Sequence, residues 1–170
     1  QVSDFHNVES KKLTNDLVKN IQKQQPNIIV ITGDFVDANR TNINVALKFI
    51  QKIKAIAPMY YVTGNHEAKI NQYGKYEQLK NGLIENGVVV LDNQAAVIEM
   101  GDAQINLLGI NDPAMKREST ASDKEIINTA ISNLDYDKNC FSVLLSHRPE
   151  VLDVYAANEI DLVLKIGRAH

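Results

Sequence analysis

The chain alternates between segments with helical spacing and short runs of β-branched residues, and this alternation constrains its fold more than any other feature. Leu13, Leu17 and Ile21 recur at helical spacing, and the near-continuous apolar run NIIVIT follows Pro26. A run of this kind is typical of a strand that is buried on both faces of a sheet. Because the same alternation repeats along the chain, the sequence indicates an α/β fold.

The same patterns predict the remaining elements. Beyond the first helix, helical spacing recurs over about residues 43–53, 76–87 and 126–134. The predicted strands are NIIVIT, MYYVT, VVVLDN, QAAVIEM, QINLLGI, FSVLLS and DLVL. Gly101-Asp102, between QAAVIEM and QINLLGI, is a short-turn signal that predicts an antiparallel hairpin and therefore a mixed sheet.

Length and charge limit the classes of protein to which the chain can belong. Its 170 residues are about one domain's worth of chain, and a hydrophobic content of 44% is enough for a buried core. A net charge of −3 with no basic run leaves no evident surface for a nucleic-acid backbone. No stretch approaches the ~20 apolar residues that span a bilayer. Only QVS precedes Asp4, which is short for a strand, so we expect the chain to begin inside one.

Polar residues follow four of the apolar runs at the point where each run stops. The four segments are VSDFH, VITGDFVD, YVTGNHE and LLSHRP, and they contain three of the four histidines. In open α/β sheets, ligands bind at the carboxyl ends of strands. We therefore expect these polar residues to converge on one site.

Each segment also has a purely structural explanation. Asp4 and His6 form a common D-x-H spacing, Gly33-Asp34 could be only a turn, and GNHE could be a loop of turn-forming residues. His147 could be a capped core histidine. Their joint occurrence favours a function, because carboxylates, imidazoles and an amide oxygen form a ligand set suited to Mn, Fe, Zn or Co.

A pair of such cations about 3.5–4 Å apart can clamp a phosphoryl group and lower the pKa of bound water towards ~7. One aspartate must then bridge the two cations. Asp34 is our choice, because it lies between the other clusters in sequence and follows a glycine that lets the backbone approach closely.

The motifs DFH, GDFVD, GNHE and SHRP, in this order, resemble those of the calcineurin-like metallophosphoesterases. The resemblance extends over residues 1–164, and PNIIVITGDFVD, YYVTGNHE and LLSHRPE are most similar to the bacterial single-domain branch. It implies an α/β fold with two mixed β-sheets packed as a sandwich and flanked by helices. It also implies a dinuclear metal centre, in which Asp4, His6 and Asp34 hold one divalent ion and Asp34, Asn65 and His147 hold part of the second.

The resemblance further implies hydrolysis of phosphate mono- or diesters of a small molecule or a lipid. Hydroxide activated by the metal pair would attack phosphorus, and His66 would protonate the leaving oxygen as a general acid. Asp37 would accept the other ring N–H of His66 and fix its tautomer.

Two other functions are compatible with parts of this pattern. One is a metal-binding or regulatory module of the same fold without turnover, although Asp34, Asn65 and His66 are all present. The other is a doubly wound nucleotide-binding domain. No G-x-G-x-x-G or P-loop motif follows any of the predicted strands, so the defining feature of that class is missing.

The last six residues, KIGRAH, do not match the G-H-x-H motif that ends the family's pattern. Arg168 stands where the first histidine is expected, and an arginine has no lone pair for a cation. Codons for these six residues match a common sequencing-adapter oligonucleotide. We therefore expect residues 165–170 to be an adapter-derived tail in which His170 is not a ligand.

On this interpretation, residues 1–164 form a partial phosphoesterase domain that is incomplete at both ends and weakly active or inactive by itself. The bacterial branch often has an N-terminal membrane segment. The resemblance thus implies a full-length protein that is anchored or exported at the cell envelope, or is otherwise cytoplasmic.

Overall fold

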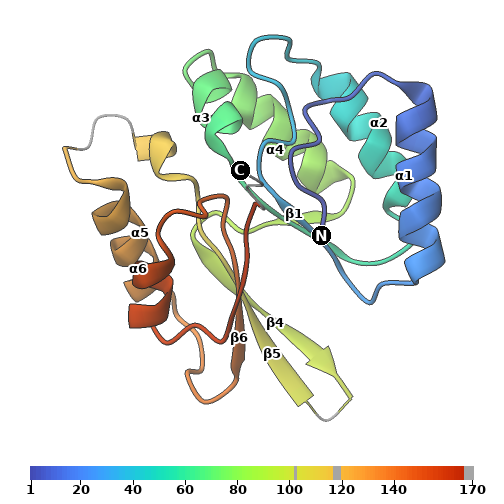
Figure 1. Ribbon diagram of the computed structural model, residues 1–170. Helices are drawn as coiled ribbons and strands as arrows, with labels where there is room; N and C mark the ends of the chain where they lie inside the picture. Colours follow the sequence, from blue (N-terminus) through green and yellow to red (C-terminus); the bar gives the residue numbers. More distant parts are fainter. Residues whose placement is uncertain (102, 117–119, 167–170) are drawn as a thin grey trace.

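Two β-sheets form the centre of the molecule, and helices cover their outer faces (Figure 1). The structure is a computed structural model that describes residues 1–101, 103–116 and 120–166. The first sheet consists of β1 (Ile29–Thr32), β2 (Met59–Val62) and β3 (Val88–Val90), which are parallel. Val2 extends it by a parallel bridge to Ile31.

The second sheet contains the predicted hairpin. Its order is β4 (Gln94–Met100), β5 (Ala103–Gly109), β6 (Phe141–Leu145) and β7 (Leu162–Leu164). β4 and β5 pair antiparallel, and the other neighbours pair in parallel. The predicted pair of sheets flanked by helices is confirmed. Mixed pairing was expected in both sheets, but only the second sheet has it among the described strands, because those of the first sheet are all parallel.

The helices lie in two groups, one beside each sheet (Figure 1). Beside the first sheet are α1 (Lys11–Gln24), α2 (Ile43–Ile53), α3 (Asn65–Asn71) and α4 (Lys75–Glu85), and beside the second are α5 (Asp123–Ser132) and α6 (Leu152–Ala157). The short helix η1 (Pro113–Lys116) contacts both α3 and α5. Sequence periodicity predicts α1, α2, α4 and α5 but not α3, α6 or η1, which have seven residues or fewer and show too little repeat. None of the helices in the described part of the chain is both long and apolar enough to cross a bilayer.

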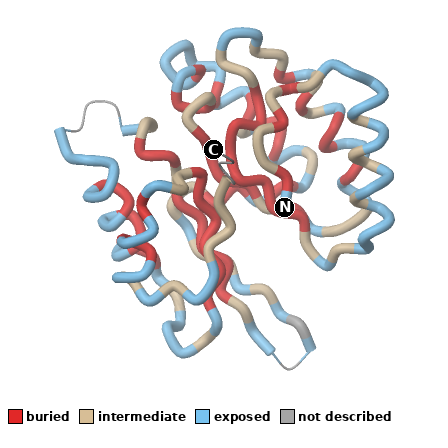
Figure 2. Tube along the Cα trace, in the orientation of Figure 1, coloured by how far each residue is buried: buried red, intermediate tan, exposed pale blue. Residues whose placement is uncertain are grey.

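Successive residues of a strand face different layers of the core. In β1, Ile29 and Ile31 pack against the helices, whereas Val30 packs between the two sheets. In β6, Leu144 faces the helices and Val143 faces the other sheet. Buried positions accordingly run through the centre of both sheets (Figure 2). This burial on two faces explains why the strands read as continuous apolar runs.

Gly109 lies where the two sheets meet, and we expect Gly109→Ala to destabilise the fold. An added Cβ would overlap the side chain of Leu91 and lie 2.9 Å from Cγ1 of Val62. Overpacking of this kind lowers the free energy of unfolding by about 1–3 kcal/mol, which urea denaturation can measure. Gly82→Ala is the matched control, because its Cβ would meet the flexible end of Leu47. Equal losses in the two variants would contradict the prediction.

Candidate metal centre

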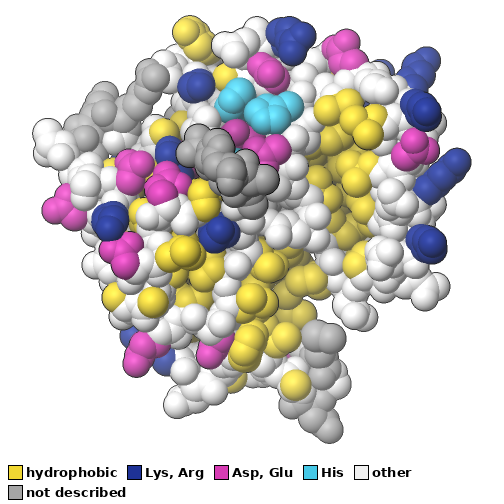
Figure 3. Space-filling view, in the orientation of Figure 1, with side chains coloured by type: hydrophobic (Ala, Val, Ile, Leu, Met, Phe, Trp, Pro, Cys, Tyr) yellow, Lys and Arg dark blue, Asp and Glu magenta, His cyan; other side chains and the backbone are white. Residues whose placement is uncertain are grey.

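Loops from three strand ends converge on one face of the molecule. Asp34 follows β1, Asn65 begins α3 after β2, and His147 follows β6. Asp4 and His6 donate their backbone N–H groups to carbonyl oxygens of the loop after β1. Histidine and acidic side chains lie side by side on this face (Figure 3). The structure thus brings together the five residues predicted as metal ligands, although their roles stay predictions.

The buried carboxylate of Asp34 lies at the centre of this cluster. Its Oδ2 is 3.3 Å from Nε2 of His147 and 3.9 Å from Nε2 of both His6 and His66. Burial alone would raise the pKa of Asp34, but the hydrogen bond and charge of His147 hold it below the usual value. One ionised oxygen facing three imidazoles suits the bridging role predicted for Asp34.

The loops around Asp34 approach each other closely and adopt uncommon backbone conformations. A Cβ on Gly64 would overlap the Asp34 carboxylate, and a Cβ on Gly33 would lie 2.7 Å from Cα of Gly64. Asp4, His6 and Asp34 have φ values of 54°, 47° and 49°. Positive φ is uncommon outside glycine, and residues held in such conformations cluster at functional sites.

Glu67, which is fully buried in α3, ties the loops after β1 and β2 together. Its Oε2 accepts the backbone N–H groups of Asp34 at 2.9 Å and Gly64 at 2.7 Å. Its Oε1 accepts those of Phe35 at 2.8 Å and Val36 at 3.2 Å. Burial, with a smaller contribution from the charge of Asp34, raises the pKa of Glu67 to about 7.

This role of Glu67 is not predicted from the sequence, although the signal is present. Glu67 stands three residues after Gly64, the residue before the first turn of α3, and it accepts the N–H of that residue as in a capping box. The acidic residue at the end of GNHE therefore indicates that a short helix begins within this motif.

His147 is buried, and the backbone fixes its tautomer. Its Nδ1 donates to the carbonyl oxygen of Thr32 at 2.8 Å, which leaves Nε2 facing Asp34. Burial alone would lower the pKa of His147, but the Asp34 carboxylate raises it to about 9. Asp34, Asn65 and His147 line one cavity of about 210 Å³, so the residues predicted for the second ion share one space.

His66 makes a different hydrogen bond from the predicted one. Its Nδ1 accepts the backbone N–H of Ala38 at 2.9 Å, so the neutral ring carries its proton on Nε2. The predicted bond from His66 to Asp37 is therefore wrong in this geometry. Oδ1 of Asp37 instead accepts the backbone N–H groups of Asn39 and Arg40. Burial lowers the pKa of His66, which also favours the neutral ring.

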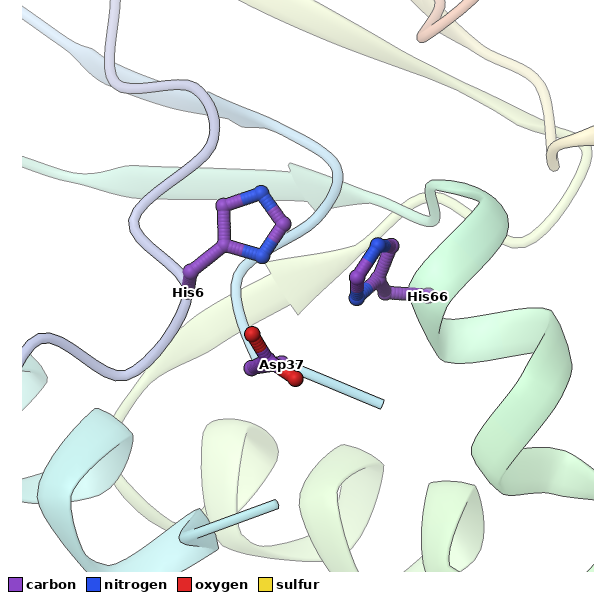
Figure 4. Close-up of side chains that lie close together, drawn as sticks. All are labelled: His6, Asp37 and His66. Carbon is purple, nitrogen blue, oxygen red and sulfur yellow. The ribbon is translucent and has the colours of Figure 1, made fainter. Parts of the chain in front are cut away.

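The donors around Asp34 fit a divalent cation. One ligand atom from each of Asp4, His6 and Asp34 lies within 4.8 Å of the others, and Nε2 of His6 is 3.8 Å from Oδ1 of Asp4. Carboxylate and imidazole donors in this combination suit Mn, Fe, Zn or Co. A second group of this kind consists of His6, Asp37 and His66 (Figure 4). It fits a cation less well, because His66 has no free lone pair in its neutral form.

The tail falls largely outside the described residues. Arg168 and His170 are not among them. The adapter interpretation of residues 165–170, and the domain boundary at residue 164 that depends on it, both stay predictions.

Replacing Glu67 by glutamine should weaken the fold and the cluster together. Glu67→Gln keeps the size of the side chain but turns one acceptor oxygen into an amide that faces backbone N–H donors. We expect the free energy of unfolding to fall by about 1–3 kcal/mol and divalent-cation affinity to fall with it. Urea denaturation and calorimetric titration with Mn²⁺ measure the two effects. Glu85→Gln, at an exposed position of α4, is the control, and matching results in both variants would refute the role of Glu67.

The stability of the metal-free protein should fall as the pH rises from about 7 to 9. The folded state raises the pKa of His147 from 6.5 to about 9, so it binds this proton more tightly than the unfolded chain does. The stabilisation is complete below pH 6.5 and is lost through pH 9, at about 1.36 kcal/mol for each pKa unit. Denaturation in the presence of EDTA should show this slope in the wild type. The prediction fails if His147→Gln retains the same slope.

A family model described as calcineurin-like phosphoesterase matches residues 1–167. Over 154 residues the chain is 29% identical to the uncharacterized metallophosphoesterase YkoQ of Bacillus subtilis (strain 168). That match covers 89% of this chain and 53% of the relative, so the chain spans about half the relative's length.

Solved structures show the same fold. The chain resembles TT1561 of Thermus thermophilus with a TM-score of 0.65 at 13% identity, covering 99% of this chain and 80% of that one. It also resembles the phosphopantetheinyl hydrolase PptH of Mycobacterium tuberculosis with a TM-score of 0.61 at 16% identity, covering 92% and 70%. At these identities the likeness shows the fold alone. Together with the sequence match, it confirms the family and fold inferred from the four motifs: the chain belongs to the calcineurin-like phosphoesterase family.

Proposed function

We propose that the protein is a dinuclear metal-dependent hydrolase of phosphate mono- or diesters. One observation carries the proposal, which is the position of Asp34 between two groups of donors. Asp4 and His6 lie on one side of its carboxylate, and His147 lies 3.3 Å away beside the cavity that Asn65 also lines. A single charge shared between two donor groups is what a pair of cations requires.

The residues of the chain hold and orient the reacting groups. Divalent cations of Mn, Fe, Zn or Co, when bound, supply a Lewis acid for phosphoryl oxygens and lower the pKa of water. Asp34 would hold the cations through its carboxylate, and Glu67 holds the Asp34 loop in place through three backbone amides and ties it to Gly64 through a fourth. The positive φ of Asp34 is maintained by this network, so the ligand is preorganised before any cation binds.

His66 is placed to assist the leaving group. Its Nε2 lies 3.9 Å from Oδ2 of Asp34, and the neutral ring can donate a hydrogen bond from this nitrogen to a leaving oxygen. Full proton transfer needs a cationic ring with a second proton on Nδ1. That step requires Nδ1 to exchange the Ala38 amide for an acceptor such as Asp37, whose carboxylate belongs to the same 4.8 Å group.

One of the spaces beside the cluster favours a polar substrate. A cavity of about 310 Å³ lies next to His6 and Asp37, and its other lining residues are Asn7, Val8, Glu9 and Arg40. Five of these six side chains are polar. The phosphate ester of a small molecule therefore suits this cavity better than the ester of a lipid.

A binding or regulatory module without turnover is the second candidate. The bond from Ala38 to His66 favours it, because it withholds Nδ1 from the proton that acid catalysis needs. Hydrolysis of bis(p-nitrophenyl) phosphate separates the two candidates. Because the chain spans about half of its relative, the assay is run both on this chain and on the product of the whole gene. Metal binding without hydrolysis in either form would favour the module.

Substitutions of Asp34 and of His66 should have distinct effects on cation binding and turnover. Asp34→Asn should abolish tight cation binding because the shared charge is lost. His66→Asn should preserve cation binding and lower turnover by ~10²–10⁴-fold, with a larger loss for an alkyl ester than for a p-nitrophenyl ester, whose leaving group needs little help. Metal analysis and kinetics with both esters test this, and loss of metal in His66→Asn would contradict the role of His66.

A further inference from the structure

A buried ion pair joins Asp112 and Arg148 beside the donor cluster. Nε of Arg148 donates to Oδ2 of Asp112 at 2.6 Å, and Nη2 donates to Oδ1 at 2.8 Å. The side chain of Asp112 is fully buried, and that of Arg148 is 22% exposed. Because burying two charges offsets most of what their attraction contributes, stability alone does not explain a pair of this kind.

The guanidinium of Arg148 is not free to bind a phosphate group. It lines the cavity of about 210 Å³ beside the cluster, which would suit such a role. Besides the bonds to Asp112, however, Nη1 lies 3.2 Å from Oε1 of Glu150 and 3.7 Å from Oδ2 of Asp123. Three carboxylates therefore offset its charge, and a phosphate would have to displace them. This arrangement favours a guanidinium that is fixed in place for a geometric reason.

Asp112 connects loops that belong to different sheets. Its carboxylate binds Arg148 in the loop after β6, a strand of the second sheet. Its backbone N–H donates to Oγ1 of Thr63 at 2.9 Å, in the loop after β2 of the first sheet. Oδ1 also accepts the backbone N–H of Ala114 at 2.9 Å, which holds the carboxylate at the start of η1. Asp112 thus links the ends of β2 and β6.

The residues that Asp112 links are neighbours of two ligands predicted for the second ion. Thr63 precedes Asn65 by two positions, and Arg148 directly follows His147. Asn65 follows a strand of the first sheet and His147 a strand of the second, so their relative position depends on how the sheets meet at this edge. The three ligands predicted for the first ion, by contrast, all follow β1 or the segment bridged to it.

The backbone around His147 is also held from its own sheet. The hydroxyl of Tyr155 in α6 donates to the carbonyl oxygen of Arg148 at 2.7 Å and lies 2.7 Å from Oγ of Ser146. The ring of His147 reaches the first sheet through the bond from Nδ1 to the carbonyl oxygen of Thr32. The ion pair adds a second link to the first sheet, and this link acts on the backbone from which the ring extends.

We propose that Arg148 and Asp112 are positioning residues for His147, because they hold its loop beside the loop of Asn65 so that both side chains reach the second ion. The inference rests on the proposed dinuclear centre. It gives the pair no contact with substrate. Binding of the first ion does not depend on the pair, since its ligands do not span the two sheets.

The metal-free chain tests the position of His147 directly. Its Nδ1–H is buried against the carbonyl oxygen of Thr32 and should give a downfield proton resonance that exchanges slowly with water, which His147→Gln assigns. Arg148→Lys keeps the charge, so Asp112 is not left unpaired, but one ammonium group cannot reproduce the two parallel bonds. We expect the resonance of His147 to be lost through faster exchange in this variant.

Two control variants separate positioning from a general loss of stability. Lys124→Gln breaks an exposed ion pair, in which Nζ lies 2.6 Å from Oδ2 of Asp153. Ile53→Val removes a buried methyl group from α2 and lowers stability outside this network. Both variants should retain the resonance of His147. Its loss in Ile53→Val would mean that any destabilisation releases the ring, and would overturn the proposal.

Mn²⁺ binding by the product of the whole gene provides the second readout. Two Mn²⁺ ions that share a carboxylate give a spin-coupled electron paramagnetic resonance spectrum, whereas a single ion does not. Arg148→Lys should weaken binding of the second ion by ~10–100-fold, the range typical for loss of an outer partner of a ligand, and leave the first unchanged. At the same Mn²⁺ concentration the coupled spectrum should therefore give way to that of a single ion.

The outcomes separate this inference from the proposed function. An Arg148→Lys variant that retains the His147 resonance, or that weakens both ions equally, overturns the role of the pair, and so does a wild type without a slowly exchanging Nδ1–H. If Arg148→Lys fails to fold, the double variant Asp112→Asn, Arg148→Gln decides, because it leaves no unpaired charge in the interior. A wild type that binds no second Mn²⁺ ion, while Arg148→Lys still loses the resonance, counts against the dinuclear centre and leaves the role of the pair intact.

Discussion

The buried carboxylate of Glu67 is the interaction on which the site depends. It accepts four backbone N–H groups from the loops that follow β1 and β2. Without this acceptor the four donors would be buried with no partner, at a cost of about 1–3 kcal/mol each. The sharp loop that places Asp34, with its φ of 49°, is therefore stable because a side chain from α3 satisfies the amides around it.

The same arrangement places two carboxylates close together in the interior. The charge of Asp34 adds to the effect of burial in raising the pKa of Glu67. Backbone N–H groups offset this for Glu67, and the imidazolium of His147 offsets it for Asp34. In the metal-free protein His147 is thus the counter-charge of Asp34, and a cation that binds Asp34 must displace a proton. The excess negative charge that makes this interior costly to fold is what makes it suited to a cation.

Periodicity was enough to predict the elements that pack against each other, but not the local contacts that shape the site. Continuous apolar runs predict β1, β2 and β6, since their residues are buried on both faces. The helix α3 is missed because Gly64 and Asn65 are turn formers and only seven residues follow the helical pattern. The partner of His66 is missed for a different reason, because it is the backbone N–H of Ala38. Every residue except proline has such a group, so the amino-acid type at position 38 does not indicate that its N–H faces His66.

The site contains three histidines, and the hydrogen-bond partner of Nδ1 determines what each ring can do at Nε2. His147 donates from Nδ1 to a carbonyl oxygen, so its Nε2 becomes a free donor atom towards Asp34 once the ring loses its second proton. His66 accepts at Nδ1 from an amide, so its Nε2 carries a proton and faces the same oxygen as a hydrogen-bond donor. The backbone thus makes one imidazole a ligand and prevents the other from being one. Among the described residues the Nδ1 of His6 has neither kind of backbone partner, so the backbone does not fix which of its nitrogens carries the proton.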